Sequence, residues 1–304
     1  MSAPDDQPRW LVHIDEQVSK VYMDTAETDM LLVIRDMLLA PDGDENATPN
    51  AIQEVQAYYR DNYCPADDPS WKQNPADGIY DVLASLLLQV FDVAGFMSFK
   101  FDNIRHKRLA DLVIGLERQA QREFNLEDPQ LGWGESILLQ EAFQAWDGCR
   151  LGPVSSLTMC SEALGVNTLL SRLTAAGLLG KRGVAWAKTS IDKALDEPAV
   201  ENSTPLAVNA AASIATQYIL LAGEVLAAEV DDGTWNTWAA KLREIADDAA
   251  AAEWHLKENA RKAYAKMVQI RPGFGRRRRR RRKRRRTNSG GWNVAIAVWR
   301  WAIF

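Results

Sequence analysis

The chain has 304 residues, 47% of them hydrophobic, and this composition excludes a globally disordered protein. Its net charge of −5 combines two unlike parts, because twelve of the 36 basic residues and none of the 41 acidic residues follow Gly275. Residues 1–275 therefore carry 24 basic and 41 acidic side chains, a net charge of −17. This charge excludes nucleic-acid binding by residues 1–275 alone, because they repel phosphate backbones.

The cysteines and histidines show no spacing of a metal site or a disulfide framework. The three cysteines are odd in number without a CxxC pair, and the three histidines stand far apart: Cys64, Cys149, Cys160, His13, His106 and His255. Residues 1–7 are polar and lack the apolar segment of a signal peptide. We therefore expect reduced thiols, no metal or cofactor, and a cytoplasmic or nuclear protein.

Apolar residues at helical spacing predict helices through the first half of the chain. The pattern covers Trp10–Tyr22, Asp29–Ala40 and Asp102–Phe124. Thr48-Pro49 and Asn74-Pro75 each indicate a helix start, since proline is favoured in the first turn after a capping residue. The helix after Asn74-Pro75 contains a nearly continuous apolar stretch, residues 79–91. We interpret this stretch as a central buried helix, because it is too short to span a membrane.

The helix predicted over Asp102–Phe124 begins with three basic residues, Arg105, Lys107 and Arg108. Positive charge near a helix N-terminus opposes the helix dipole. An acidic partner, or an acidic group elsewhere in the fold, would account for this basic edge. We expect the simpler arrangement, an exposed cluster.

In the second half, further helices are predicted over Glu135–Trp146, Ser161–Leu179 and Ala185–Leu195, with Gly177 and Gly180 as stop signals. Another helix begins at Pro205, capped by Ser203 or Thr204. No strand and no repeat of fixed period is predicted.

The stretch Thr234–Met267 has the clearest period of all, and it predicts one long helix. Apolar residues recur there at steps of three and four, with only the step at Asn259/Ala260 weak: Trp235, Trp238, Leu242, Ile245, Ala249, Ala252, Leu256, Ala263 and Met267. Asp231-Asp232-Gly233 predicts a turn that folds this helix back on the preceding one as an antiparallel hairpin. Eleven tryptophans in such a chain are expected to anchor helix contacts; a ligand platform is the alternative.

Short motifs that would carry chemistry are incomplete. Gly132 and Gly134 lack the preceding strand and third glycine of a dinucleotide fingerprint. Gly134-Glu135-Ser136 lacks the last glycine of a nucleophile elbow. The sequence therefore predicts no catalytic residue, and we expect that the protein is not an enzyme.

The sharpest feature is an unbroken run of eleven basic residues. The run consists of Arg276, Arg277, Arg278, Arg279, Arg280, Arg281, Arg282, Lys283, Arg284, Arg285 and Arg286. It is typical of a nuclear import signal or of an arm that binds nucleic acid. Because like charges repel, we expect disorder from Gly275 to Gly291.

The segment Trp292–Phe304 that follows the run is apolar and rich in tryptophan. A basic run beside such a segment also fits an anchor on a membrane surface. With thirteen residues, the segment is too short to span a bilayer, and we expect no transmembrane segment. The opposing interpretation is that a translated intron or a shifted reading frame produces the run and the segment.

Two stretches resemble a known family. Residues Glu162–Gly177, EALGVNTLLSRLTAAG, resemble the motif N-x-x-x-x-R-L-x-x-x-G, and Trp235–Leu242 resembles W-x-x-W-x-x-x-(F/L). Together they are similar to the fungal proteins grouped as domain of unknown function 3632, over roughly residues 25 to 270. Leu164 and Leu169 depart from the aromatics expected there. The resemblance implies a mostly helical intracellular protein, brings no catalytic residue, and leaves out the Arg276–Arg286 run.

These observations predict an all-α protein. Residues 1–9 form a flexible N-terminus, residues 10–270 a single multi-helix domain that ends in a long helix hairpin, and residues 271–304 a disordered basic tail. A division into two lobes near Gly148–Pro153 is the alternative. The first hypothesis is a non-enzymatic module that binds an unidentified protein partner. The second is a nuclear protein that associates with nucleic acid through Arg276–Arg286. The third is an enzyme or small-ligand binder without a recognisable motif.

Overall fold

The computed structural model describes residues 7–20, 25–63, 75–100, 102–123, 137–196, 203–248 and 253–272. Within these ranges the protein is all-helical and has no β-strand, as the sequence predicts. The described residues form eleven α-helices and one short 3-10 helix: α1 (Arg9–Val18), α2 (Thr25–Leu39), α3 (Ala47–Tyr63), α4 (Pro75–Gly95), α5 (Ile104–Glu123), α6 (Leu139–Gly148), α7 (Leu157–Ala175), α8 (Gly180–Leu195), α9 (Pro205–Glu229), α10 (Asp232–Asp247), η5 (Glu253–His255) and α11 (Leu256–Ile270).

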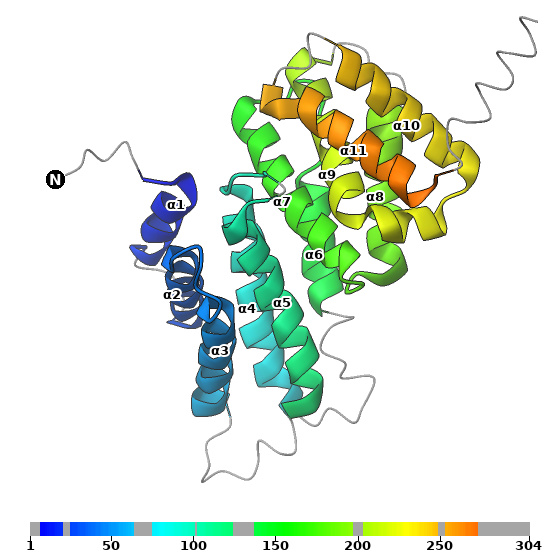
Figure 1. Ribbon diagram of the computed structural model, residues 1–304. Helices are drawn as coiled ribbons and strands as arrows, with labels where there is room; N and C mark the ends of the chain where they lie inside the picture. The colour runs from blue at the N-terminus through cyan, green and yellow to red at the C-terminus, as the bar shows by residue number, and fades with distance from the viewer. Residues whose placement is uncertain are drawn as a thin grey trace, which may run out of the picture.

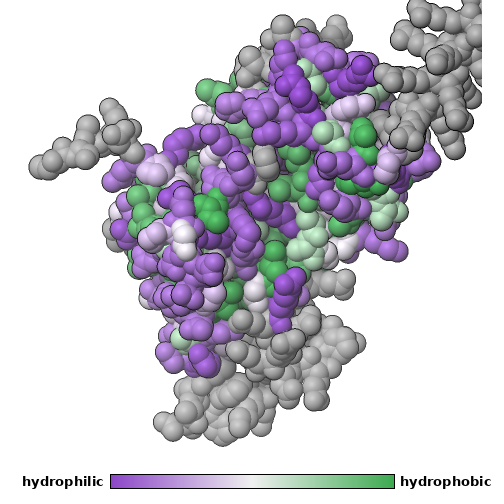
Figure 2. Space-filling model, in the orientation of Figure 1, coloured by the Kyte–Doolittle hydropathy of each residue, from purple (hydrophilic) through white to green (hydrophobic). Residues whose placement is uncertain are grey.

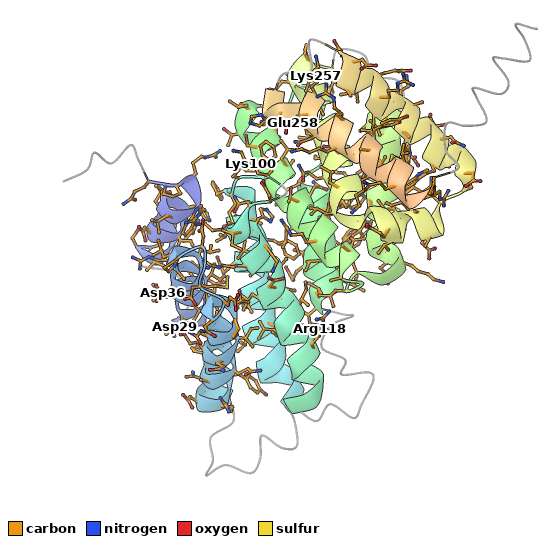
Figure 3. All side chains as sticks on the ribbon, in the orientation of Figure 1. Asp29, Asp36, Lys100, Arg118, Lys257 and Glu258 are labelled. Carbon is orange, nitrogen blue, oxygen red and sulfur yellow. The ribbon has the colours of Figure 1, made fainter. Side chains whose placement is uncertain are left out.

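The helices follow the order of the chain in space. Figure 1 shows α1, α2 and α3 at one side, α4 and α5 in the middle, and α8 to α11 at the other side. α4 packs against α2 and α7, and α5 packs against α3 and α7. One hydrophobic cluster runs through these contacts from Trp10 in α1 to Met267 in α11. Charged side chains such as Asp36, Lys100 and Glu258 lie on the outside (Figure 3).

α7 and α9 form the core of the C-terminal half. Twelve residues of α7 and fourteen of α9 are buried, and α9 packs against α7, α8 and α11. α9 is also long and apolar enough to cross a membrane by length and composition. This is weak evidence for a membrane span, because 67% of the apolar window is buried inside the protein and a core helix passes the same test.

Several helix ends lie where local chemistry predicts them. The Thr204 hydroxyl accepts a hydrogen bond from the Ala207 backbone and caps α9 at its N-terminus. Asp231 caps α10 in the same way. Gly177 follows α7 with a φ of +82°, a left-handed conformation that glycine adopts without steric cost. α8, however, begins at Gly180, five residues before the predicted start.

The prediction of one long helix over Thr234–Met267 is wrong. α10 ends at Asp247, and α11 begins at Leu256 after the short η5. The two residues before α11, Trp254 and His255, have φ values of 49° and 56°. A left-handed conformation costs a residue with a side chain about 1–2 kcal/mol. The tertiary fold therefore imposes this break against the local preference of the chain.

The C-terminal helix hairpin is formed by other helices than predicted, because α10 pairs with α11 and not with α9. α10 and α11 form an antiparallel pair with each other, since Arg271 after α11 meets Asp232 at the start of α10. α11 then lies along α9 in the parallel direction: Leu256 packs near Ala212, and Lys266 bonds the carbonyl oxygen of Leu220. Most of the described residues of the apolar stripe are buried, as predicted: Trp235, Trp238, Leu242, Ala263 and Met267 are all 0% exposed, whereas Ile245 is half-buried.

Candidate interaction surface

The predicted nucleic-acid site, Arg276–Arg286, lies outside the described residues, which end at Pro272. Gly132–Ser136 and Trp292–Phe304 also lie outside them. The structure therefore neither supports nor contradicts the interpretations of these segments.

Arg271, just before the basic run, has a structural role. Its guanidinium donates hydrogen bonds to the carbonyl oxygens of Ala227 and Val230 at the end of α9. It also forms an ion pair of 2.8 Å with Asp232 and lies 5.3 Å from the centre of the Trp235 ring. These contacts fasten the end of α11 to α9 and α10.

No group of three or more His, Cys, Asp or Glu side chains in the described part of the chain could hold a metal ion. His13 in α1 lies 2.6 Å from the Asp92 carboxylate of α4 and stacks on Phe96, with ring centroids 3.9 Å apart. His13 lies in the contact between α1 and α4, whereas His106 lies in the contact between α5 and α7.

His106 is fully buried where α4, α5 and α7 meet. Its Nε2 donates a hydrogen bond of 2.9 Å to the carbonyl oxygen of Gly165. Burial, with the positive charge of Arg172, lowers the pKa of His106 from 6.5 to about 4, so the ring is neutral at pH 7. Gly165 also permits the close approach of α7 to α4, because a Cβ there would lie 2.1 Å from the carbonyl oxygen of Ala94.

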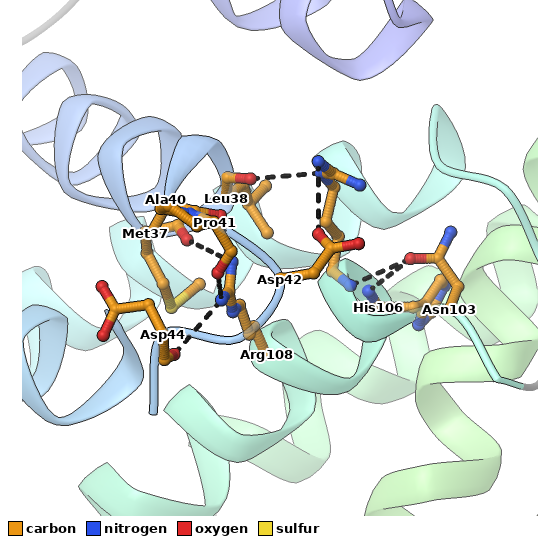
Figure 4. A network of polar contacts seen from close by, with 10 residues as sticks. Met37, Leu38, Ala40, Pro41, Asp42, Asp44, Asn103, His106 and Arg108 are labelled. Carbon is orange, nitrogen blue, oxygen red and sulfur yellow. Dashed lines mark hydrogen bonds and ion pairs between the residues drawn. The ribbon is translucent and has the colours of Figure 1, made fainter. Parts of the chain in front are cut away.

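The basic edge of α5 is internal in part, and the expectation of an exposed cluster is wrong for two of its residues. Figure 4 shows Arg108, which is 3% exposed, directed at the turn after α2. Its guanidinium donates to the carbonyl oxygens of Met37, Ala40, Pro41 and Asp44.

Arg105, half-buried beside Arg108, donates to the carbonyl oxygen of Leu38 and pairs with Asp42 at 3.5 Å. The carbonyl groups at the end of α2, rather than a ligand, thus explain these two charges. Lys107 is exposed, as expected.

The residues of the sequence motif around Asn167 are also structural. The Asn167 Oδ1 accepts a hydrogen bond of 3.1 Å from the Tyr218 hydroxyl and joins α7 to α9. Burial raises the pKa of Tyr218, so its hydroxyl stays a donor. Burial lowers the pKa of Arg172, which Asp111 and Asp102 counteract. The motif thus describes how α7 packs, rather than a reacting group.

The half-buried thiol of Cys149 lies near Tyr218 of this contact. Burial and the negative charge of Glu162 raise the pKa of Cys149 to about 11. The thiol is therefore protonated at neutral pH and is a poor nucleophile.

One end of α7 and α9 is apolar and open to solvent. Eight large hydrophobic side chains of the described residues are exposed, and three of these lie within six residues: Val154 is 75% exposed, Leu157 60% and Met159 51%. A fourth, Val208 at 39%, lies one turn after Thr204, whose backbone N–H bonds the carbonyl oxygen of Pro153 at 2.8 Å. We call Val154, Leu157, Met159 and Val208 the α7–α9 apolar end.

This end is uncharged, in contrast to the rest of the protein. Residues 151–161 and 203–209 contain no Asp, Glu, Lys or Arg, although residues 1–275 carry a net charge of −17. The face of the protein that Figure 2 shows is mostly hydrophilic, with smaller hydrophobic areas between the hydrophilic ones. An uncharged run in such an acidic chain was the only signal of this surface in the sequence, and the helix pattern alone gave no reason to expect Leu157 and Met159 outside the core.

Comparison with known proteins adds a family match. The model of the family described as "Protein of unknown function (DUF3632)" matches residues 89–285. The match begins later than the resemblance predicted from residue 25, and it includes residues 276–285, which the resemblance left out. No curated protein and no solved structure matches the chain.

Proposed function

The chain belongs to the DUF3632 family, and we propose that this member is a non-enzymatic interaction module that binds a protein partner through the α7–α9 apolar end. The observation that carries the proposal is the exposure of four apolar side chains near the N-terminal ends of α7 and α9, on segments without charged residues in an acidic protein. Clustered exposed apolar groups are typical of protein–protein contact sites, whose centres are depleted in charge. We further propose a cytoplasmic or nuclear location.

The chemistry of this end defines the kind of partner. A charged group buried against Leu157 and Met159 would lose its hydration without gaining an ion pair. The partner must therefore present an uncharged apolar segment. Ser156 and Thr158, both exposed, lie between the apolar residues and supply hydroxyl groups for the rim of the contact.

The test is site-specific photo-crosslinking in the cell that expresses the protein. A photoreactive phenylalanine analogue replaces Leu157 in one variant and Leu39 in a matched control. Leu39 is similarly exposed at 48%, but it lies at the end of α2. We expect a discrete crosslinked protein from position 157 and none from position 39.

A second pair of variants checks the energetics of that contact. Leu157→Asp should reduce capture of the crosslinked partner at least about tenfold, because it places a charge in the contact. Leu39→Asp should leave capture unchanged. Equal crosslinking at both positions, or undiminished capture by Leu157→Asp, would contradict the proposal. Far-ultraviolet circular dichroism verifies that both variants fold.

A second candidate function is nucleic-acid association through Arg276–Arg286. It rests on the eleven consecutive basic residues, most of which lie within the family match at residues 276–285. Such binding should lack sequence preference, and its affinity should fall with salt at a log–log slope of about −0.9 per duplex phosphate engaged, at most about −10 for the run.

Titration of a fluorescent duplex with full-length protein, and with a form that ends at Gly275, tests this candidate. Equal binding by the two forms, or binding that is independent of salt, would exclude it.

A further inference from the structure

Met159 differs in exposure from the other methionines of the described residues. It is 51% exposed in the first turn of α7, whereas four others are at most 4% exposed: Met30, Met37, Met97 and Met267. Met1 and Met23 lie outside the described residues. An oxidant in solution reacts with a thioether that it can reach, so among these five side chains it meets Met159 first.

The start of α7 holds this thioether in solvent. Ser156 caps the helix, and its hydroxyl accepts a hydrogen bond of 3.2 Å from the Met159 backbone N–H. Helix side chains lean toward the N-terminus of their own helix, and at this end residues 156–159 are all exposed. The Met159 side chain therefore stays accessible while its backbone is fixed.

The two described cysteines compete poorly for a peroxide. Cys160 is 0% exposed, and the Cys149 thiol, whose pKa burial raises to about 11, is protonated at neutral pH. The reactive form of cysteine is the thiolate, whereas a thioether needs no deprotonation. Peroxide at neutral pH therefore reacts with the sulfur of Met159 in preference to these two thiols.

We propose that Met159 is an oxidation site, and that its sulfoxide weakens binding at the α7–α9 apolar end. A lone pair of the Met159 sulfur attacks one oxygen of hydrogen peroxide. An S–O bond forms as the O–O bond breaks, the sulfur loses two electrons, and the second oxygen leaves as water with both protons. A methionine sulfoxide reductase reverses the change with a dithiol as the reductant, and the oxygen again leaves as water.

The sulfoxide changes the polarity of this end without adding a charge. Its S–O group accepts hydrogen bonds, so a partner that covers it with apolar groups must remove water from it without replacing the hydrogen bond. The inference rests on the proposed function, because the partner described there presents an uncharged apolar segment. Binding is then strong in the reduced protein and weak in the oxidised one.

Peroxide treatment of the full chain, followed by peptide mass spectrometry, tests the site. In the folded protein we expect Met159 to be oxidised at least about tenfold faster than each of the four buried methionines, because those react only during local opening. In concentrated urea the five rates should become about equal. Equal rates in the folded protein would overturn the proposal.

Retention on a phenyl-substituted resin measures the effect on apolar binding without a partner. Wild type and Met159→Leu are each compared before and after peroxide, so that each protein is its own reference; leucine has a similar volume and is not oxidised. We expect the wild type to elute earlier after peroxide and to recover after reduction by the two methionine sulfoxide reductases with dithiothreitol. Met159→Leu should not shift. Unchanged retention of the wild type, or an equal shift in both proteins, would overturn the proposal.

The partner crosslinked at position 157 separates this inference from the proposed function. Oxidation should reduce capture by the wild type at least about fivefold and should not change capture by Met159→Leu relative to its own untreated form. Undiminished capture by the oxidised wild type would overturn the inference, while the proposed function would stand. If position 157 yields no partner, the proposed function fails, and the mass spectra and the retention on the resin still decide between support and refutation of the oxidation site.

Discussion

Acid destabilisation through His106 is the most direct consequence of the packing among α4, α5 and α7. The unfolded chain takes up a proton at this histidine near its ordinary pKa of 6.5, whereas the folded chain resists protonation until about pH 4. Between these values the unfolded state binds more protons, so stability rises with pH and falls as the solution is acidified. This contribution is complete above pH 6.5 and lost at pH 4.

The magnitude follows from the difference in pKa. A shift of one unit corresponds to about 1.4 kcal/mol, so the full loss is about 3 kcal/mol, of which about 2 kcal/mol appears by pH 5. The physical reason is local. Nε2 already donates its proton to Gly165, while Nδ1 has no hydrogen-bond partner among the described residues. A proton added at Nδ1 would be buried near the positive charge of Arg172.

Urea unfolding at pH 7.5 and pH 5, for the wild type and His106→Gln, measures this effect. Glutamine keeps an amide donor for the Gly165 carbonyl but does not titrate. Burial raises the pKa values of Glu117 and Glu141, so these two groups change the stability with pH in the opposite direction. Their contribution is the same in both proteins, and it cancels when the loss of stability of His106→Gln is subtracted from that of the wild type. If His106→Gln lost as much stability as the wild type on acidification, the assignment to His106 would be refuted.

Three further outcomes are expected in unfolding experiments. Trp238→Ala should lower the free energy of unfolding by about 2–5 kcal/mol, because it is a large-to-small change in the core. Glu258→Ala should change it by no more than about 0.5 kcal/mol, because Glu258 is exposed. Equal shifts of the urea midpoint in the two variants would contradict the assignment of Trp238 to the buried stripe. Gly165→Ala should destabilise by at least about 1–3 kcal/mol through overpacking, whereas Gly148→Ala, with no neighbour within 4 Å, should not destabilise. Truncation after Gly275 should leave helicity and the urea midpoint nearly unchanged, and a clear loss would show that residues 276–304 support the fold.

The helical architecture could be predicted because local signals agree with the fold along most of the chain. Thr204-Pro205 indicates a helix start from hydrogen-bond chemistry alone, and α9 begins there. The stripe through Trp235 and Trp238 identifies core residues correctly, because burial of one helix face follows from the period itself.

Features that depend on distant residues could not be predicted in this way. The charges of Arg105 and Arg108 oppose the dipole of their own helix, and the groups they bind lie 64 to 71 residues earlier in the chain. The α7–α9 apolar end is likewise set by which faces neighbouring helices leave uncovered. Periodicity identifies an apolar face, but not whether another helix covers it.

The break before α11 is neither a locally predicted feature nor one set only by distant residues. Here the sequence pattern predicts a structure, one long helix, that the folded chain does not adopt. Two left-handed residues cost about 1–2 kcal/mol each. Burying Leu256 and Met267 stabilises by roughly 1.5–3 kcal/mol each, and Ala260 and Ala263 add to this. Within one chain the broken form is therefore favoured, because straightening would expose all four side chains.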